Sequence, residues 1–537
     1  MAISAIAGLA SVGSAMITAK TFAIGFGMAL KHFALGAALS AVSRALSPKL
    51  DQQNLQGTTD NIKSPISAKK LIYGKTRVGG TLVMMGSDGT DNKYLTLVVA
   101  IAGHRVNAFK EVYLNDEKIW DADATPNYQG IYYTNPSDPT ADPLASLEFI
   151  VGSDTNIVSS LCTNHMPGYT NAHTMNGNAA IVARLRYDAE VYTQGIPKIT
   201  CVVEGNRVYD PRQDEFSPYY DSSIGSGHRS NGAWHELGYT SNPALILLDY
   251  IRDEKYGLGE SISNIDLQSF VDAADVCDED VNLDDGGTQK RYTCDGVLDT
   301  SRSIRANIED ILSTMIGTLT LVGGKYVLNA YEYRTPSLDI NESHLIEPLT
   351  VVTKNSRRNT YNAVKGMFPS SEDNYIPTDY PAQISTQYAQ DDGETIYLDM
   401  SLPLTTDNIR AQRIARLTML KSRFQTSVSM TLNLTGLKVK VGDNIRLSNT
   451  RLGYSNKIFE VISFNLIPDA DKGLAVQIDA LENDVAAYTW NTSDEIDFTT
   501  GGTVSLYDGR TAEPVTALTL DAISDVNTDG SVSPAIG

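Results

Sequence analysis

The sequence predicts a multidomain protein of the α+β class that is mainly β, with an α/β central domain and an apolar helical N-terminus. Three observations carry this prediction. The 537 residues are too many for one hydrophobic core, so three or four domains are expected. Most of the chain consists of short apolar or alternating runs separated by Gly, Asn, Asp and Pro, as in strands joined by tight turns. Apolar residues at helical spacing gather in a block near the middle.

The first fifty residues form an apolar leader. They contain no Asp or Glu, carry Lys20, Lys31, Arg44 and Lys49, and are rich in Ala and Gly. No basic residue stands near the start, so the pattern differs from a secretory signal. We expect helices that pack closely at glycines. The apolar positions expected to mediate packing or membrane contact are Ile3, Leu9, Ile17, Phe22, Phe26, Leu30, Phe33 and Leu39.

Three interpretations of the leader stay open. Its helices can pack against symmetry-related copies or another protein, it can be stored and later enter a membrane, or it can be a permanent membrane anchor. Lys20, Lys31 and His32 interrupt the apolar runs and weigh against the anchor. The polar residues 51–63 that follow are expected to be a linker.

A first β domain is predicted over 64–239. Its strands are expected at 70–73, 81–85, 95–101, 111–114, 117–120, 179–186 and 198–204, and the phrase 73–80 is expected to join the first two. The run 95–101 is apolar almost throughout, which indicates a strand buried on both faces. Asn115-Asp116 is a tight turn signal. Arg77 is interpreted as a strand-edge residue that bonds carbonyls rather than as a functional cation.

An inserted domain is expected within the first one, at about 122–193, because Tyr, Asn, Pro, Thr and Ser rise there. His165 and His173 stand near acids and amides. A metal site would need two further ligands at workable spacing, and none is evident, so no metal is expected. A loop rich in Pro, Ser, Gly, Tyr and Arg follows at 208–239.

The central domain is predicted over 240–340. Pro243 suits the first position of a helix, which the glycines of Tyr256-Gly257-Leu258-Gly259 end. Ser263 or Asn264 is expected to cap a second helix. A third helix is expected over 303–314, and a hairpin over 319–328 across Gly323-Gly324.

The third domain is predicted over 341–490. A strand begins near Asn362, and Thr405 to Asp407 are expected to cap a helix over 408–422. Further strands are expected at 424–434 and 445–447, with a hairpin at 457–466 and 474–481. The helix carries a basic stripe of Arg410, Arg413, Arg416 and Lys421, interpreted as a solvated face rather than a surface for acidic partners or phosphate.

The order of these phrases resembles the tail-tip hub proteins of long-tailed phages, the family of the lambda-type tip attachment protein. The resemblance covers roughly 64–488, and it makes the first and third domains two tail-tube-like β-barrels. One phrase departs from the family, since Val441 stands where a proline is usual. The signature positions are Tyr73, Gly74, Arg77, Gly79, Gly80, Asn242, Pro243, Tyr256, Gly257, Gly259, Asn362, Gly442 and Asp443.

Residues 491–537 are expected to be an extension. Its stretch 513–520 resembles the first strand of a fibronectin-like domain, so the extension either docks on a neighbour or opens a further domain of a longer product.

The resemblance implies a structural hub in the virion, at the distal tail tip, assembled in the host cytoplasm. Such hubs form homotrimers that close the tail tube. The implied partners are distal tail and tail-tube proteins, the tape-measure protein and a tail fibre or receptor-binding protein. The leader would touch the host membrane transiently, and DNA would pass without specific binding. The alternatives are a hub of a contractile or gene-transfer-agent-like injection apparatus, and a host-binding adhesin.

Composition and motifs exclude other classes. With 43 Lys and Arg against 64 Asp and Glu, the net charge is −21, which disfavours nucleic-acid binding over the general surface. No nucleophile elbow, zinc-protease, P-loop or dinucleotide motif is present, so neither an enzyme nor a cofactor is expected. The four cysteines fit no zinc pattern. Free buried thiols are expected, with a Cys277–Cys294 disulfide as the lesser alternative.

Overall fold

The computed structural model describes residues 67–123, 131–133, 143–153, 155, 157–188, 192, 195–224, 229–230, 233–234, 238–354, 360–469, 473–497, 522–526 and 532–536. The leader lies outside this range, and with it the predicted positions Ile3, Leu9, Ile17, Phe22, Phe26, Leu30, Phe33 and Leu39. Within the described range, no helix has the length and apolar character needed to cross a membrane.

Two compact units make up the chain, 1–496 and 497–537. The second unit contains one antiparallel hairpin, β29 (Ala522–Val526) with β30 (Val532–Ile536). The stretch 513–520, expected to resemble a fibronectin-like strand, is outside the described residues. Because the first unit is continuous, the predicted domain boundaries inside it remain predictions, and we keep the three domain names for reference.

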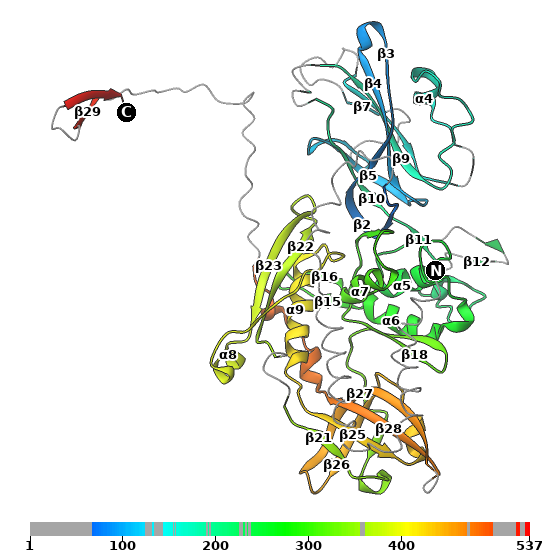
Figure 1. The fold of residues 1–537 in the computed structure, drawn as a ribbon, viewed down its shortest axis with the longest axis vertical. Coiled ribbons are helices and arrows are strands. Elements are labelled where there is room, and N and C mark those ends of the chain that lie inside the picture. The colour runs from blue at the N-terminus through cyan, green and yellow to red at the C-terminus, as the bar shows by residue number, and fades with distance from the viewer. Residues whose placement is uncertain are drawn as a thin grey trace, which may run out of the picture. The chain divides into compact units, whose positions relative to one another are not determined.

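Two facing sheets form the first domain (Figure 1, blue to cyan). One has the order β2-β10-β5-β6, formed by Lys75–Gly79, Ile199–Glu204, Ala108–Leu114 and Glu117–Asp121. The other has the order β3-β4-β9-β8-β7, formed by Thr81–Asp88, Tyr94–Ala102, Ala179–Arg186, Ala145–Ile150 and Ile131–Tyr133. Val78 and Cys201 from the first sheet share one core with Leu97 and Ile181 from the second.

Neither sheet of the first domain closes on itself within the described residues, so the structure does not show the barrel. The phrase 73–80 was expected only to join two strands, and that prediction was wrong, because 75–79 is strand β2, paired with β10. At Gly80 the chain passes to the other sheet. A methyl group on Gly80 would lie 2.4 Å from Val99 Cγ1, so the crossing needs glycine.

The 122–193 stretch contributes β7, β8 and β9 to the five-stranded sheet. It also contains α4 (Ser160–His165), whose Cys162 and Met166 pack on Val98 and Val182 across the face opposite to the shared core. Strand β4 is central and mostly buried, which confirms the prediction made from its apolar run.

Three helices and short hairpins build the central domain (Figure 1, green). Helices α5 (Pro243–Arg252), α6 (Leu267–Asp278) and α7 (Ile304–Ser313) pack around α5, which is buried over most of its length. The predicted hairpin is confirmed as β18 (Thr318–Val322) and β19 (Lys325–Asn329). Strand β1 (Lys70–Tyr73) leaves the first domain and pairs with β17 (Gly296–Asp299).

One helix start was predicted wrongly. Ser261 begins a separate 3-10 turn, Ile262–Asn264, and α6 starts later with Asp266 at its N-cap. The predicted caps Ser263 and Asn264 lie inside that turn, since the hydroxyl of Ser261 accepts from Ser263 N. Short pairs complete this part of the chain: β11 (Arg207–Val208) with β14 (Gly238–Tyr239), β12 (Arg229–Ser230) with β13 (Ala233–Trp234), and β15 (Asp280–Asn282) with β16 (Thr288–Lys290).

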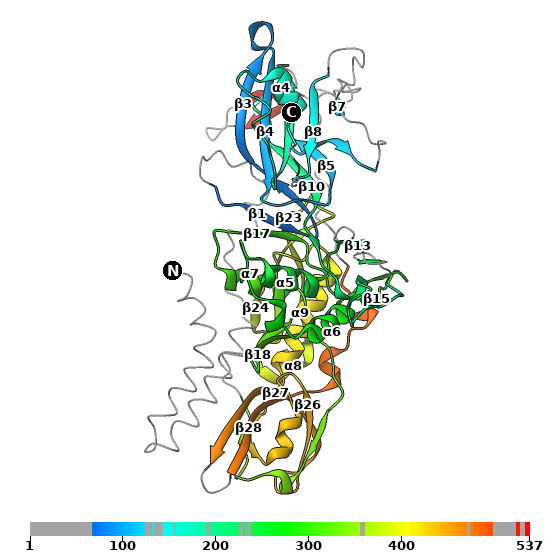
Figure 2. The same ribbon diagram turned by 90° about the vertical axis from the view of Figure 1, so that its right-hand side faces the viewer.

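The third domain contains two sheets (Figure 2). The six-stranded sheet has the order β20-β26-β27-β28-β25-β21, formed by Leu338–Ile340, Asn444–Asn449, Tyr454–Asp469, Gly473–Glu482, Ser427–Leu432 and Thr350–Val352. The three-stranded sheet has the order β23-β22-β24, formed by Ile376–Ile384, Ala363–Ser370 and Tyr397–Asp399. Helix α8 (Thr386–Asp392) follows β23.

Helix α9 (Asn408–Ser422) has the bounds that its spacing predicted, and Asp407 caps it. It packs on β22 and β23 on one side and bonds the central domain on the other (Figure 1, yellow). Its basic stripe was expected to be solvated, and that prediction was wrong, because Arg410 and Arg413 are buried. Overall the mainly β class is confirmed. Neither domain shows a closed barrel within the described residues.

Candidate functional site: the polar junctions of the central domain

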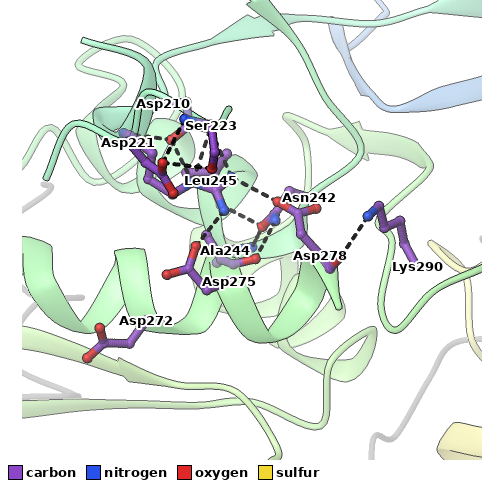
Figure 3. A network of polar contacts seen from close by, with 12 residues as sticks. Asp210, Asp221, Ser223, Asn242, Ala244, Leu245, Asp272, Asp275, Asp278 and Lys290 are labelled. Atoms are coloured by element: carbon purple, nitrogen blue, oxygen red, sulfur yellow. Dashed lines mark hydrogen bonds and ion pairs between the residues drawn. The ribbon is translucent and has the colours of Figure 1, made fainter. Parts of the chain in front are cut away.

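Asn242 organises the start of α5 (Figure 3). Its Oδ1 accepts from Ala244 N at 3.1 Å and from Leu245 N at 3.4 Å, and its Nδ2 donates to Ala274 O of α6 at 2.9 Å. Pro243 takes the first helical position, where a missing N–H leaves no bond unmade. One buried amide therefore begins one helix and fixes it to the next.

Arg212 lies beside this cap and joins the loop 208–239 of the first domain to α6. Its guanidinium is buried and donates to Asp210 Oδ2 at 2.9 Å, Asp275 Oδ1 at 2.8 Å and Asp278 Oδ2 at 2.8 Å. Burial opposes its charge, but the hydrogen bonds and attraction of Asp210, with those of Asp275 and Asp278, raise the pKa of Arg212. Figure 3 shows Asp275 and Asp278 toward the network and Asp272 away from it.

Gly74 marks the closest approach between the first domain and the central domain. Its φ is +62°, and a methyl group there would lie 2.3 Å from both Asp295 Oδ1 and Cys294 O. Asp295 Oδ1 accepts from Lys75 N at 2.9 Å and from Ser241 Oγ at 2.6 Å. Burial raises the pKa of the Asp295 carboxyl. Asp295 N donates to Leu404 O of the third domain at 2.8 Å, so this residue touches all three domains.

Tyr73 adds a second bond across the same junction. Its hydroxyl donates to Asp249 Oδ2 on α5 at 2.7 Å, and Asn206 Nδ2 donates to that oxygen at 3.0 Å. Burial raises the pKa of Asp249 to about 6, with the nearby Asp253 adding to the effect. We call the contacts that Tyr73, Gly74, Lys75 and Arg212 make with the central domain the first joint.

The remaining signature residues of the first domain sit apart from this joint. Arg77 is buried, its Nη2 donates to Thr200 Oγ1 at 2.8 Å, and its Cζ lies 4.0 Å from the centre of the Tyr113 ring. The prediction that Arg77 bonds carbonyls was therefore wrong; it also pairs with Asp116. Gly79 ends β2, and Gly80 is the crossing described above.

The Tyr256-Gly257-Leu258-Gly259 phrase turns the chain after α5, as predicted. Gly257 N and Gly259 N both donate to Asp253 O, and Tyr256 N donates to Asp253 Oδ1. A methyl group on Gly257 would lie 1.8 Å from Tyr250 O, and Gly259 has a φ of +68°. Both glycines are required by geometry.

Asn362 and Gly442 hold turns of the third domain. Asn362 Oδ1 accepts from Ile396 N at 2.8 Å, and its Nδ2 donates to Glu394 O at 2.9 Å, which positions β24 beside β22. Gly442 has a φ of +91°, and a methyl group there would lie 2.4 Å from Asn329 Nδ2 of the central domain. Asp443 accepts from Lys440 N at 2.9 Å and closes that turn.

The basic stripe of α9 forms a second joint between the third and central domains. Arg410 Nε donates to Lys290 O at 3.1 Å and its Nη1 to Thr293 Oγ1 at 2.8 Å, while Arg413 Nη1 donates to Arg291 O at 2.9 Å. Burial, and then Arg410, lower the pKa of Arg413 to about 10. We call these contacts of α9 with 289–293 the second joint.

Sequence reasoning missed the two joints. Arg212 lies in the stretch 208–239, which was predicted only to be a loop, and Asp249 and Asp295 had no assigned role. Asp210-Pro211-Arg212 did contain a signal, because an Asp before a helix-like turn is a usual cap, and here Asp210 Oδ1 accepts from Arg212 N at 2.9 Å.

The two histidines noted in the sequence lie apart from the joints. His165 Nδ1 is 3.2 Å from Asp88 Oδ2, and His173 Nδ1 bonds Thr170. Across the described ranges, no three His, Cys, Asp or Glu side chains are placed to hold a metal. All four cysteines are free and buried, as predicted. What the joints can do chemically is fix domains by charge and hydrogen bonding.

Comparisons with known proteins show which proteins this chain resembles. A family described as putative phage tail protein matches residues 303–461. The tip attachment protein J of Escherichia phage SECphi27 is 26% identical over 292 residues, covering 52% of this chain and 23% of that protein. The baseplate hub protein pb3 of Escherichia phage T5 is 23% identical over 298 residues, covering 52% of this chain and 30% of that protein. The match spans less than a third of either relative.

A solved structure shares the fold. One chain in the virion of a native gene transfer agent particle covers 88% of this chain and all of its own length, with a TM-score of 0.57 and 12% identity. Together these comparisons confirm the resemblance to the phage tail-tip hub family.

Proposed function

We propose that this protein is a structural hub in the virion, at the distal tip of a long-tailed phage tail. The observation that carries the proposal is that both curated relatives, each matched over about half of this chain, are named for the tail tip or the baseplate hub. The two joints support it, because they fix three domains by buried polar contacts, as a rigid machine part requires. We propose a structural rather than an enzymatic role, which the names of the two curated relatives support.

The proposed assembly is a homotrimer that closes the tail tube. It joins the tail-tube and distal tail proteins above to a tail fibre or receptor-binding protein below, and it opens for the tape-measure protein and DNA. In a closed ring each copy buries two different faces. The net charge of −21 supports passage of DNA without binding, since like charges repel along the path.

The predicted domains fit this assembly. We propose that the first and third domains, 64–239 and 341–490, contact neighbouring proteins, and that the central domain, 240–340, holds these two domains in place through the two joints. We propose that the apolar leader either packs against tail components or enters the host membrane. The signature residues keep the close approaches on which the domain arrangement depends.

The mass of the purified protein in solution tests this proposal. Multi-angle light scattering is expected to give three times the 58.3 kDa of one chain. An antibody against the third domain is expected to label the distal end of intact tails. A stable monomer that hydrolyses peptidoglycan would contradict the proposal, and so would label along the tail body.

A second candidate is the hub of a gene-transfer-agent-like injection apparatus. The fold shared with a chain of such a particle over 88% of this sequence favours it. Electron microscopy of the particle that carries the protein separates the two candidates, because a phage head packages its own long genome and a gene transfer agent packages short host fragments. Sequencing the packaged DNA decides between them.

A further inference from the structure

Three arginines of α9, each three residues apart, meet three different environments in or beside the second joint. Arg410 donates to Lys290 O, Thr293 Oγ1 and Gln289 Oε1, so its Nε, Nη1 and Nη2 each have an acceptor. Arg416 Nη2 forms an ion pair with Asp494 Oδ1 at 3.0 Å. Arg413 stands between them and is fully buried, at 0% exposure.

Of these three arginines, Arg413 has the most hydrogen-bond donors without an acceptor. Its Nη1 donates to Arg291 O at 2.9 Å, but its Nε and Nη2 find no acceptor in the part of the chain that the structure describes. The ion pairs found there include neither Arg413 nor Arg410. Burying a charged group whose donors lack partners costs free energy, so Arg413 disfavours the contact of α9 with 289–293.

The surroundings of Arg413 offset only part of this cost. The Trp490 ring lies 5.6 Å from its Cζ, a distance at the outer limit of a cation–π contact. Asp407 and Tyr292 favour the charged form, whereas burial, Arg410 and Arg291 oppose it, and the pKa of Arg413 is lowered as a result. These surroundings therefore favour the charged guanidinium less than water does, although with a pKa of about 10 it keeps its charge at neutral pH.

We infer that forming the second joint costs electrostatic free energy, mainly at Arg413, and that this joint therefore separates more readily than the first joint. When α9 moves away from 289–293, water hydrates the Arg413 guanidinium and its two unmet donors. In the first joint the equivalent buried cation, Arg212, would lose two carboxylate partners on α6, Asp275 and Asp278, and keep only Asp210 of its own turn. If the protein is the proposed hub, its opening would therefore begin between the third and central domains. That role rests on the proposed function, whereas the difference in stability between the two joints does not.

Two backbone amides report on separation of the domains that the two joints hold together. Asp295 N donates to Leu404 O, so its hydrogen is exposed only when the third domain separates from the central one. Lys75 N donates to Asp295 Oδ1, so its hydrogen reports on the first joint. Hydrogen–deuterium exchange of the purified full chain, read at single-residue resolution, is expected to be faster at Asp295 than at Lys75.

The test compares Arg413→Met with the matched variant Arg410→Met. Arg413→Met keeps the volume and removes the charge, so exchange at Asp295 is expected to slow by about tenfold while Lys75 is unchanged. Arg410→Met removes three satisfied bonds, and exchange at Asp295 is expected to accelerate. Arg413→Gln, which is uncharged but polar, is expected to slow exchange in the same direction as Arg413→Met.

Two outcomes would contradict the inference about Arg413. If Arg413→Met accelerates exchange at Asp295 as Arg410→Met does, Arg413 is a net stabilising contact, for example through bridging water, and the inference is wrong. A failure of Arg413→Met to fold contradicts it as well. A monomeric protein absent from tails would overturn the proposed function and leave this result standing.

Discussion

The two joints of the central domain bury cations in opposite ways. In the first joint, Arg212 is surrounded by the carboxylates of Asp210, Asp275 and Asp278. In the second, Arg410 and Arg413 are buried against neutral carbonyl, hydroxyl and amide groups. The comparison teaches that a buried arginine is not by itself a sign of a strong contact. What decides the stability of each joint is whether an opposite charge is buried with the cation.

Removing the cation of the first joint is expected to have the largest effect. Arg212→Met removes the buried cation that pairs with Asp210, Asp275 and Asp278, so the free energy of unfolding should fall by about 3 kcal/mol. Urea denaturation followed by circular dichroism measures this loss. Arg212→Met combined with Asp210→Asn should recover part of it, because the buried negative charge next to the lost cation is gone as well. A loss below about 1 kcal/mol would show that Arg212 is not the centre of the joint.

The close approach at Gly74 is expected to come next. Gly74→Ala places a methyl group against the carbonyl of Cys294 and forces a φ of +62° on alanine, at a cost of about 2–3 kcal/mol. Gly323→Ala is the matched control, since Gly323 has a φ of +58° but no atom within 4 Å of the added methyl group. It should cost only about 1 kcal/mol. Equal losses in the two variants would mean that the approach is not tight.

Asp249 is expected to make the first joint depend on pH. Its pKa is raised from 3.8 to about 6, so the folded protein binds a proton that the unfolded chain has released, and stability falls as pH rises from about 4 to 6. Asp249→Asn keeps an acceptor for Tyr73 and removes the charge. The variant should therefore gain about 2 kcal/mol relative to the wild type between pH 4 and pH 7.5. A difference independent of pH would show that Asp249 does not titrate in this range.

The ion pair beside the second joint is expected to give the smallest effect. Arg416 and Asp494 are partly exposed, so water screens their attraction. Arg416→Met should lower the free energy of unfolding by at most about 1 kcal/mol, and less in 1 M salt. A loss as large as that of Arg212→Met would remove the distinction between a screened pair and a buried one.

The sequence predicted those elements whose signals are local. Helices α5, α7 and α9 begin where expected, to within one residue, because Asn242, Ser303 and Asp407 cap them. The hairpin at Gly323-Gly324 follows because both glycines have positive φ. The cap of α6 was misplaced because Ser261 starts a competing turn a few residues earlier.

The joints themselves could not be predicted in this way. Tyr73 and Asp249 are 176 residues apart, and Lys75 and Asp295 are 220 apart, so no spacing in the sequence relates them. The period of α9 showed that its arginines share one side of the helix, but not that the central domain covers that side. Burial of Arg410 and Arg413 is a tertiary property.

The most direct test of the account compares Arg212→Met and Arg413→Met side by side in one urea titration. We expect Arg212→Met to unfold at a lower urea concentration, with a free energy of unfolding reduced by about 3 kcal/mol, while Arg413→Met keeps the wild-type midpoint or exceeds it. If both variants lose stability to the same extent, the two joints do not differ in kind, and the comparison fails.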